Sequence, residues 1–112
     1  MRKNWIIAVG LAAALSLLPG ASAASADESC ASGHACVWTE FHYLGAKGES
    51  LCTGGAHGLA GNKESGKNRC ANKAVWFRSS GTAIACLNPG GNDELFTFPI
   101  NEIWVGAEGS RC

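Results

Sequence analysis

Residues 30–45 decide the fold class, and they read Cys-Ala-Ser-Gly-His-Ala-Cys-Val-Trp-Thr-Glu-Phe-His-Tyr-Leu-Gly. A short apolar run ends at Trp38, and Tyr43 and Gly45 follow it in the pattern aromatic-x4-aromatic-x-Gly. Two aromatic rings at this spacing can pack around a folded-over hairpin, and glycine can adopt the positive φ that such a fold-over needs. The stretch therefore predicts a β-hairpin whose corner is formed by Trp38, Tyr43 and Gly45.

Six cysteines run from this stretch to the last residue, at Cys30, Cys36, Cys52, Cys70, Cys86 and Cys112. All of them lie downstream of a segment with the features of a secretory signal, so we expect them to meet an oxidising compartment and to pair. Six cysteines allow many connectivities, and their positions alone do not choose among them. Because a small domain buries a thin core, three disulfides worth ~2–4 kcal/mol each would supply most of its net stability.

The N-terminal segment, residues 1–26, is predicted to be a secretory signal peptide. It has a basic start, an apolar run over residues 5–18, and small residues before two candidate cleavage points, after Ala23 and after Ala26. The apolar run is shorter than the ~20 residues that span a bilayer, and no second run of that kind follows. We expect cleavage after Ala26 and an exported, soluble protein without a membrane span, folded as one domain over residues 27–112.

The rest of the chain predicts short strands joined by tight turns. It has 13 of the chain's 15 glycines and no run of Leu, Ala, Glu and Lys at helical spacing. Residues 74–79 alternate between two faces, with Val75 and Phe77 on one and Trp76 on the other. This alternation is typical of a strand with one buried face.

Residues 95–100 form a second strong strand pattern, with Phe96, Phe98 and Ile100 on one face. Pro99 lacks a backbone donor, so this strand is expected to lie at a sheet edge or to end there. Weaker strand patterns cover residues 35–39, 46–51, 82–87 and 103–105. Some six short strands at such close spacing predict a compact antiparallel sandwich.

Residues 53–68 are polar and rich in glycine, and they do not fit a strand pattern. A long loop without internal structure is uncommon in a small domain and is usually functional or mobile. We expect this loop to be either a recognition surface or flexible padding between Cys52 and Cys70.

The opening of the chain after the signal resembles the secreted peptidase inhibitor family I36. Members of that family begin with a Cys-x-x-Gly-x-x-Cys turn that runs into an aromatic strand, as Cys30, Gly33 and Cys36 do here before Trp38. The corner residues are similar to the βγ-crystallin Greek-key signature, which that family shares. Over residues 30–105 the resemblance implies an all-β fold, a small disulfide-stapled βγ-crystallin-like Greek-key sandwich.

The resemblance also implies that the first two cysteines pair as a short local clip. Chain order then suggests that the remaining cysteines pair in sequence, the last pair holding the C-terminus. The expected disulfides are Cys30 with Cys36, Cys52 with Cys70, and Cys86 with Cys112.

Residues 69–74 depart from the calcium-binding form of the crystallin signature. In βγ-crystallins a polar turn and a Ser pair at this place supply calcium ligands, whereas this chain has Arg69, Cys70 and Ala74 there. Asp93 and Glu94 are explained as a turn, because no zinc-type spacing of His and Cys accompanies them. We expect no metal site and no cofactor.

Catalytic and nucleic-acid-binding patterns are not found in the sequence. His34 and His42 are expected to be surface or packing residues, and His57 has no partner nearby in the sequence. The chain also lacks the Gly-x-Ser-x-Gly, phosphate-loop and dinucleotide motifs. Lys and Arg total 9 and Asp and Glu total 9, without a basic stripe. We therefore expect neither an enzyme nor a nucleic-acid-binding protein.

Three tryptophans lie within strand patterns, at positions 38, 76 and 104. Because a small core needs bulky side chains, we expect them to fill the core; the other interpretation is a platform that binds carbohydrate.

The resemblance implies a secreted, non-enzymatic binding protein that inhibits an extracellular protease. An inhibitor needs an exposed segment that a rigid scaffold holds ready, and residues 53–68 and 86–92 are the candidates because both adjoin cysteines. The alternative is a crystallin-like extracellular antimicrobial or cell-envelope-binding protein, and a third possibility is a structural calcium-binding module.

Overall fold

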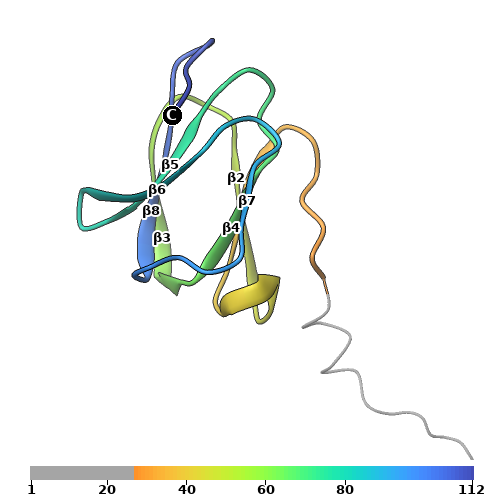
Figure 1. The fold of residues 1–112 in the computed structure, drawn as a ribbon, viewed down its shortest axis with the longest axis vertical. Helices are drawn as coiled ribbons and strands as arrows, with labels where there is room; N and C mark the ends of the chain where they lie inside the picture. The colour runs from red at the N-terminus through yellow and green to blue at the C-terminus, as the bar shows by residue number, and fades with distance from the viewer. Residues whose placement is uncertain (1–26) are drawn as a thin grey trace, which may run out of the picture.

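The computed structural model describes residues 27–112, which form a sandwich of two antiparallel β-sheets (Figure 1). The signal peptide expected over residues 1–26 lies outside the described residues. The first sheet lies on the right of Figure 1 and the second on the left, with their inner faces turned toward each other. The expected all-β, disulfide-linked sandwich is therefore confirmed. No helix among the described residues is long and apolar enough to cross a membrane.

The first sheet has the strand order β2-β1-β4-β7, and the second has the order β3-β8-β5-β6. A 3-10 turn, η3 (Phe41–Tyr43), lies between β1 and β2. The strands of the first sheet are β1 (His34–Trp38), β2 (Lys47–Leu51), β4 (Ser65–Asn68) and β7 (Asn92–Asp93). Those of the second are β3 (Gly55–Lys63), β5 (Val75–Ser79), β6 (Thr82–Leu87) and β8 (Ile100–Val105).

The two halves of the chain interlock through an exchange of strands. In each half the first strand pairs with both the second and the fourth, as β1 does with β2 and β4. The third strand of each half leaves for the other sheet, so that β3 pairs with β8 and β7 pairs with β4. These are Greek-key connections, and they bind both halves into one core.

The core lies between the sheets and is filled by the alternate side chains that face inward. Its largest fully buried hydrophobic side chains are those of Phe77, Ile100, Ile103, Val37, Val75 and Val105, whereas Trp38 is buried in a second, separate cluster with Cys36 and Tyr43. The expected inward face of β5 is confirmed, since Val75 and Phe77 are both 0% exposed. Gly66 of β4 crosses directly above the rings of Phe77 and Phe96, where a Cβ atom would come within 3.0 Å of either ring.

Three disulfides close the sandwich, between Cys30 and Cys36, Cys52 and Cys70, and Cys86 and Cys112. These are the pairings that the sequence analysis expected. Their Cα atoms lie 5.5 to 5.8 Å apart, within the range that a disulfide spans without backbone movement. Three disulfides in so small a domain are typical of a protein that resides in an oxidising environment.

The prediction of a loop over residues 53–68 is wrong, because most of this segment forms β3 and β4. These strands form because they pair with other strands, although their polar sequence does not indicate a strand. β3 pairs with the central strand β8, and β4 pairs on both sides, with β1 and with β7. Tertiary pairing therefore overrides the weak strand propensity of glycine and asparagine.

The prediction of a strand over residues 95–100 is also wrong, because most of this segment is a loop and β8 begins only at Ile100. Phe96 is 3% exposed, whereas Phe98, expected on the same face, is 64% exposed. The side chain of Asp93 accepts a hydrogen bond from the Leu95 backbone N–H at 3.0 Å and turns the chain out of β7. The four weaker strand patterns are confirmed to within a few residues, as β1, β2, β6 and β8.

One of the three tryptophans is buried, in the cluster with Cys36 and Tyr43, and the other two are partly exposed. Trp38 is 0% exposed, as expected, but Trp104 is 39% exposed and Trp76 is half-buried. The expectation that all three fill the core is therefore wrong for the second sheet. Their inner-face neighbours Val75, Phe77 and Ile103 already fill that space, so the period of two places both indoles outside.

Candidate functional site

The corner after β1 has the geometry that its residue spacing predicts. The rings of Trp38 and Tyr43 meet edge to face with centroids 5.1 Å apart. Gly45 has a φ of +81°, and a Cβ atom there would collide with Oγ1 of Thr39. That same Oγ1 accepts a hydrogen bond from the backbone N–H of Ala46 at 3.0 Å. The corner therefore requires glycine on two counts, backbone conformation and space.

Two consecutive residues in this corner have an unfavourable backbone conformation. His42 and Tyr43 both have a φ of 60°, a region that non-glycine residues rarely enter. The surroundings hold them there: the backbone N–H of His42 donates to the Glu94 carbonyl at 2.9 Å, and that of Tyr43 donates to Oγ of Ser65 at 3.1 Å. The Ser65 hydroxyl donates in turn to the Glu40 carbonyl at 2.7 Å. Backbone strain that several contacts maintain is typical of ligand-binding segments.

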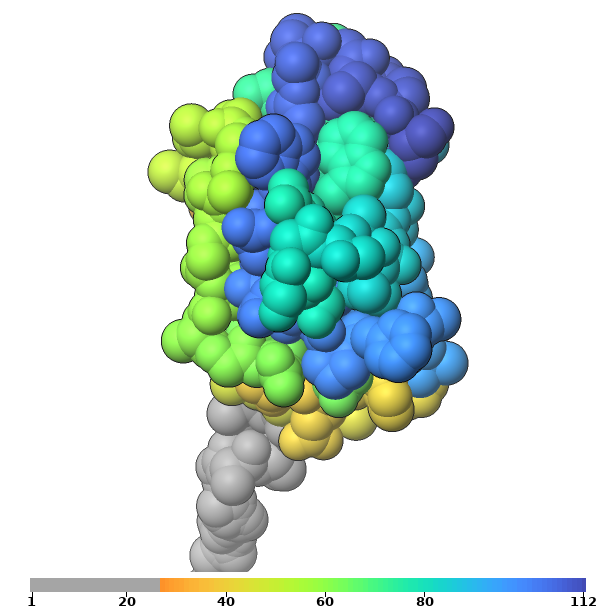
Figure 2. All heavy atoms as spheres, turned by 90° about the vertical axis from the view of Figure 1, so that its left-hand side faces the viewer, coloured from red at the N-terminus to blue at the C-terminus, as the bar shows by residue number. Residues whose placement is uncertain are grey.

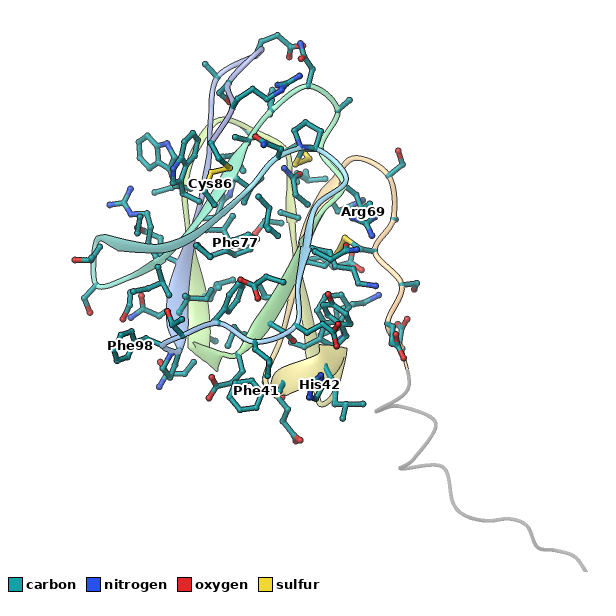
Figure 3. The ribbon with its side chains drawn as sticks, in the orientation of Figure 1. Phe41, His42, Arg69, Phe77, Cys86 and Phe98 are labelled. Carbon is teal, nitrogen blue, oxygen red and sulfur yellow. A yellow bond between two sulfur atoms is a disulfide. The ribbon has the colours of Figure 1, made fainter. Side chains whose placement is uncertain are left out.

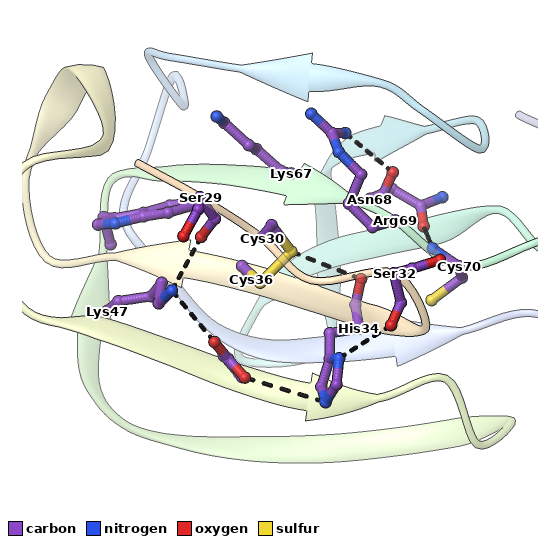
Figure 4. The surroundings of a disulfide bond; sticks show 12 residues. Ser29, Cys30, Ser32, His34, Cys36, Lys47, Lys67, Asn68, Arg69 and Cys70 are labelled. Atoms are coloured by element: carbon purple, nitrogen blue, oxygen red, sulfur yellow. Dashed lines mark hydrogen bonds and ion pairs between the residues drawn. A yellow bond between two sulfur atoms is a disulfide. The ribbon is translucent and has the colours of Figure 1, made fainter. Parts of the chain in front are cut away.

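The N-terminal residues fasten the other side of the corner (Figure 4). Lys47 Nζ donates to the Ser29 carbonyl at 2.8 Å and forms ion pairs with Asp27 at 3.0 Å and Glu49 at 3.2 Å. The Trp38 indole N–H donates to the Asp27 carbonyl at 2.8 Å. The hydrogen bond from Ser29 and then that from Lys47 lower the pKa of Asp27 from 3.8 to about 2. The segment before β1 therefore covers Trp38 and keeps the corner rigid.

Charges also surround the Tyr43 ring. The Lys67 ammonium lies 4.3 Å from the ring centroid, a cation–π contact, and donates to the Glu28 carbonyl at 2.6 Å. Burial raises the pKa of the Tyr43 phenol, and the carboxylates of Glu94 and Asp93 raise it further.

A second loop, residues 94–99, lies beside this corner. Phe96 anchors it in the core, with its ring 5.0 Å from that of Phe77, and its backbone N–H donates to the Glu64 carbonyl at 2.9 Å. The side chains of Leu95 and Phe98 point away from the core and are 52% and 64% exposed. Pro99 fixes φ at the end of the loop. The loop therefore presents two bulky apolar side chains around one buried anchor.

His42 links the corner to the second loop. Its Nδ1 lies 2.9 Å from Oε1 of Glu94, in addition to the backbone hydrogen bond between the same residues. Shallow pockets of about 370 and 420 Å³ lie on its two sides, and His42 lines both. Phe41 contributes to the first pocket and Leu95 to the second.

Large apolar side chains gather at this end of the sandwich. Figure 3 shows Phe41, His42 and Phe98 at the end remote from Cys86, with Phe98 on the side of the second sheet and the other two at η3. We call the set of Phe41, Leu44, Leu95 and Phe98 the docking end; its members are 45%, 40%, 52% and 64% exposed. Exposed apolar side chains that gather on one part of a surface mark a binding site more often than scattered ones do.

The two segments that the sequence indicated for recognition lie elsewhere. Residues 53–68 are mainly sheet, as described above. Residues 86–92 run from the end of β6 through a tight polar turn at residues 88–91 to the start of β7. In this segment the Gly91 N–H donates to the Asn88 carbonyl at 2.8 Å and Arg69 donates to Asn92 Oδ1 at 2.7 Å. This turn is rigid, but it carries no exposed large apolar side chain. The sequence feature that could have indicated the docking end is Phe98 directly before Pro99. It was instead interpreted as part of a strand over residues 95–100.

The histidines make local contacts. His34 Nδ1 lies 3.3 Å from the Ser32 carbonyl, and His57 Nε2 lies 2.7 Å from the Thr53 carbonyl. Within residues 27–112, no group of three His, Cys, Asp or Glu side chains is placed to hold a metal ion.

Comparisons with protein-family models, with curated proteins and with solved structures find no match to this chain.

Proposed function

We propose that this protein is a secreted, non-enzymatic inhibitor that binds an extracellular protease through the docking end. The resemblance of residues 30–45 to the peptidase inhibitor family, the signal segment and the three disulfides support this proposal. The observation that carries the proposal is that two adjoining loops expose bulky apolar side chains. The corner after β1 has a strained backbone that several contacts hold, and the loop of residues 94–99 is anchored in the core by Phe96.

Rigidity is what makes these loops suitable for inhibition. A protease cleft is lined by pockets for side chains, and binding energy concentrates in a few bulky anchors that fill such pockets. Phe98 is the most exposed large apolar side chain of the described residues. Because Phe96 and Pro99 hold the loop on both sides of it, little conformational entropy is lost when Phe98 enters a pocket. The same anchorage keeps the loop in place if the protease cuts it.

A panel of secreted metallo- and serine proteases tests the proposal. Purified protein in micromolar excess is expected to inhibit at least one of them in a peptide-cleavage assay. The variant Phe98→Ser is expected to weaken that inhibition at least about tenfold, since the loss of an anchor costs ~2 kcal/mol or more. Thermal unfolding should change little, because the Phe98 side chain is largely exposed.

Leu51→Ser is the matched control, because Leu51 is 62% exposed yet lies away from the docking end. It pairs with His34 at the start of β1, about four residues or ~13 Å along the strand from the corner that follows Trp38. This variant is expected to inhibit as the unchanged protein does. The proposal is wrong if no protease of the panel is inhibited, or if the two variants lose inhibition equally.

A further inference from the structure

The outer face of the second sheet carries two tryptophans side by side. Trp76 of β5 and Trp104 of β8 are direct cross-strand partners in the antiparallel register. Side chains at such positions have Cβ atoms ~4.5–5.5 Å apart and stand on the same face. Both indoles are partly exposed, so this face offers solvent a broad aromatic strip across two neighbouring strands.

Small residues flank Trp104 and Arg78, whereas the partner of Trp76 on β6 is Cys86, which is bonded to Cys112. Ala56 of β3 is the partner of Trp104 on its far side, and Ala83 of β6 is the partner of Arg78. A pocket of about 320 Å³ lies on this face, lined by Trp76, Arg78, Gly81, Ala83 and Trp104. Figure 2 shows the face, with β3 in green, β8 in blue and the β5–β6 hairpin in teal. Bulky side chains at these flanking positions would have covered the indoles.

An ion pair borders the strip. The guanidinium of Arg78 lies over the Trp104 ring at 5.1 Å from its centroid, and its Nε is 2.9 Å from Oε1 of Glu102. These two atoms are buried, and the orientation of the pair does not make a hydrogen bond, so neither atom has a hydrogen-bond partner among the described residues. Both side chains remain 26% exposed through their other atoms. Donor and acceptor groups therefore lie next to the aromatic strip with their charges mutually compensated.

We propose that this face binds a neutral, β-1,4-linked chain of N-acetylated amino sugars. One side of each pyranose ring is apolar and packs on an indole, while its hydroxyl groups need polar partners at the edge. The acetamido group carries a carbonyl acceptor and an N–H donor, which match the Arg78 guanidinium and the Glu102 carboxylate. A straight chain with a flat face suits two neighbouring indoles on one face of a sheet better than a curved, α-linked chain does.

The charges of the face favour this ligand over others. A polyanion such as a nucleic acid needs a row of basic groups, whereas Arg78 here is compensated by Glu102. A purely apolar partner would leave the ion pair without compensation for its lost water. The proposed face is separate from the docking end, so this inference does not depend on protease inhibition.

Titration of the purified protein with N-acetylchitopentaose tests the inference by calorimetry and by NMR. The indole N–H signals of Trp76 and Trp104 are expected to shift, whereas that of Trp38, which is 0% exposed, should not. Cellopentaose should bind more weakly because it lacks the acetamido groups, and maltopentaose should not bind. The NMR measurement needs no variant and so remains informative if a substitution impairs folding.

Two substitutions separate the parts of the site. Trp104→Ala is expected to weaken N-acetylchitopentaose binding at least about tenfold. Arg78→Met should retain stacking and reduce the preference for N-acetylchitopentaose over cellopentaose. Phe98→Ser is the control and should bind the oligosaccharide normally, while Trp104→Ala should keep any protease inhibition.

Three results would overturn the inference. The first is no shift of the two indole signals at millimolar N-acetylchitopentaose. The second is equal binding of N-acetylchitopentaose, cellopentaose and maltopentaose, which would mean unspecific adsorption to exposed aromatic rings. The third is unchanged affinity of a folded Trp104→Ala variant.

Discussion

Replacing Asn68 by alanine would remove the three hydrogen bonds that this buried side chain makes at one point of the fold. Asn68 is 0% exposed, and its amide donates to the carbonyls of Lys73 at 2.9 Å and Leu87 at 2.8 Å. Its Oδ1 accepts from the backbone N–H of Cys70 at 2.8 Å. One side chain thus satisfies backbone groups from the segment after β4 and from the end of β6.

The size of the expected loss follows from these partners. A buried backbone group left without a hydrogen bond costs ~1–3 kcal/mol, so three such groups set a loss of at least ~3 kcal/mol. The total stability of a small domain is ~5–15 kcal/mol. Because ~1 kcal/mol shifts the melting temperature of a domain of this size by ~4–8 °C, Asn68→Ala is expected to melt more than about 12 °C lower.

Thermal unfolding followed by circular dichroism, with the disulfides kept oxidised, measures this shift. Asn88→Ala is the matched control, because Asn88 is exposed and its Oδ1 accepts one hydrogen bond, from the Cys112 backbone N–H at 2.8 Å. Loss of that single bond is expected to cost ~1 kcal/mol. If Asn68→Ala melts no lower than Asn88→Ala, then water replaces the lost partners and the three-bond reasoning is refuted.

Two further substitutions test the corner and its fastening. Gly45→Ala is expected to lower stability by ~2 kcal/mol or more in urea unfolding, because its φ of +81° and the collision with Thr39 both oppose a side chain. Gly33→Ala, with a φ of +84° but nothing within 4 Å, should cost only ~1 kcal/mol, and equal losses would contradict the role of the collision. The pKa of Asp27 is lowered from 3.8 to about 2, chiefly by the hydrogen bond from Ser29. The ionised Asp27 therefore stabilises the folded protein above pH 3.8, and this stabilisation is lost as the pH falls toward about 2. Melting temperatures of the unchanged protein and Asp27→Asn are therefore expected to differ near neutral pH and to converge toward about pH 2; a constant difference would exclude this linkage.

Local patterns were sufficient for much of the fold because they encode short-range geometry. The spacing of Trp38, Tyr43 and Gly45, together with the family resemblance, predicted a corner whose three defining residues lie close together along the chain, although Ser65 and Glu94 also hold it in place. The alternation around Phe77 predicted both a strand and its buried face. Cysteine order, together with the family resemblance, predicted all three disulfides.

The candidate site was largely invisible in the sequence. Alternation shows that a strand has two faces, but it does not show whether a second sheet covers the outer one, and so Trp104 was expected in the core. A run such as residues 95–100 has a strand pattern, yet no strand lies where it could pair, and Phe98 is left exposed.

The sequence by itself determined that this protein would be a disulfide-linked β-sandwich with a glycine-dependent corner. Only the tertiary structure decided that the glycine-rich residues 53–68 are strands and that the docking end and the tryptophan face are open. The physical reason is that strand pairing and burial depend on partners far along the chain. β3 obtains its hydrogen bonds from β8, which begins at Ile100, and no local pattern contains that partner.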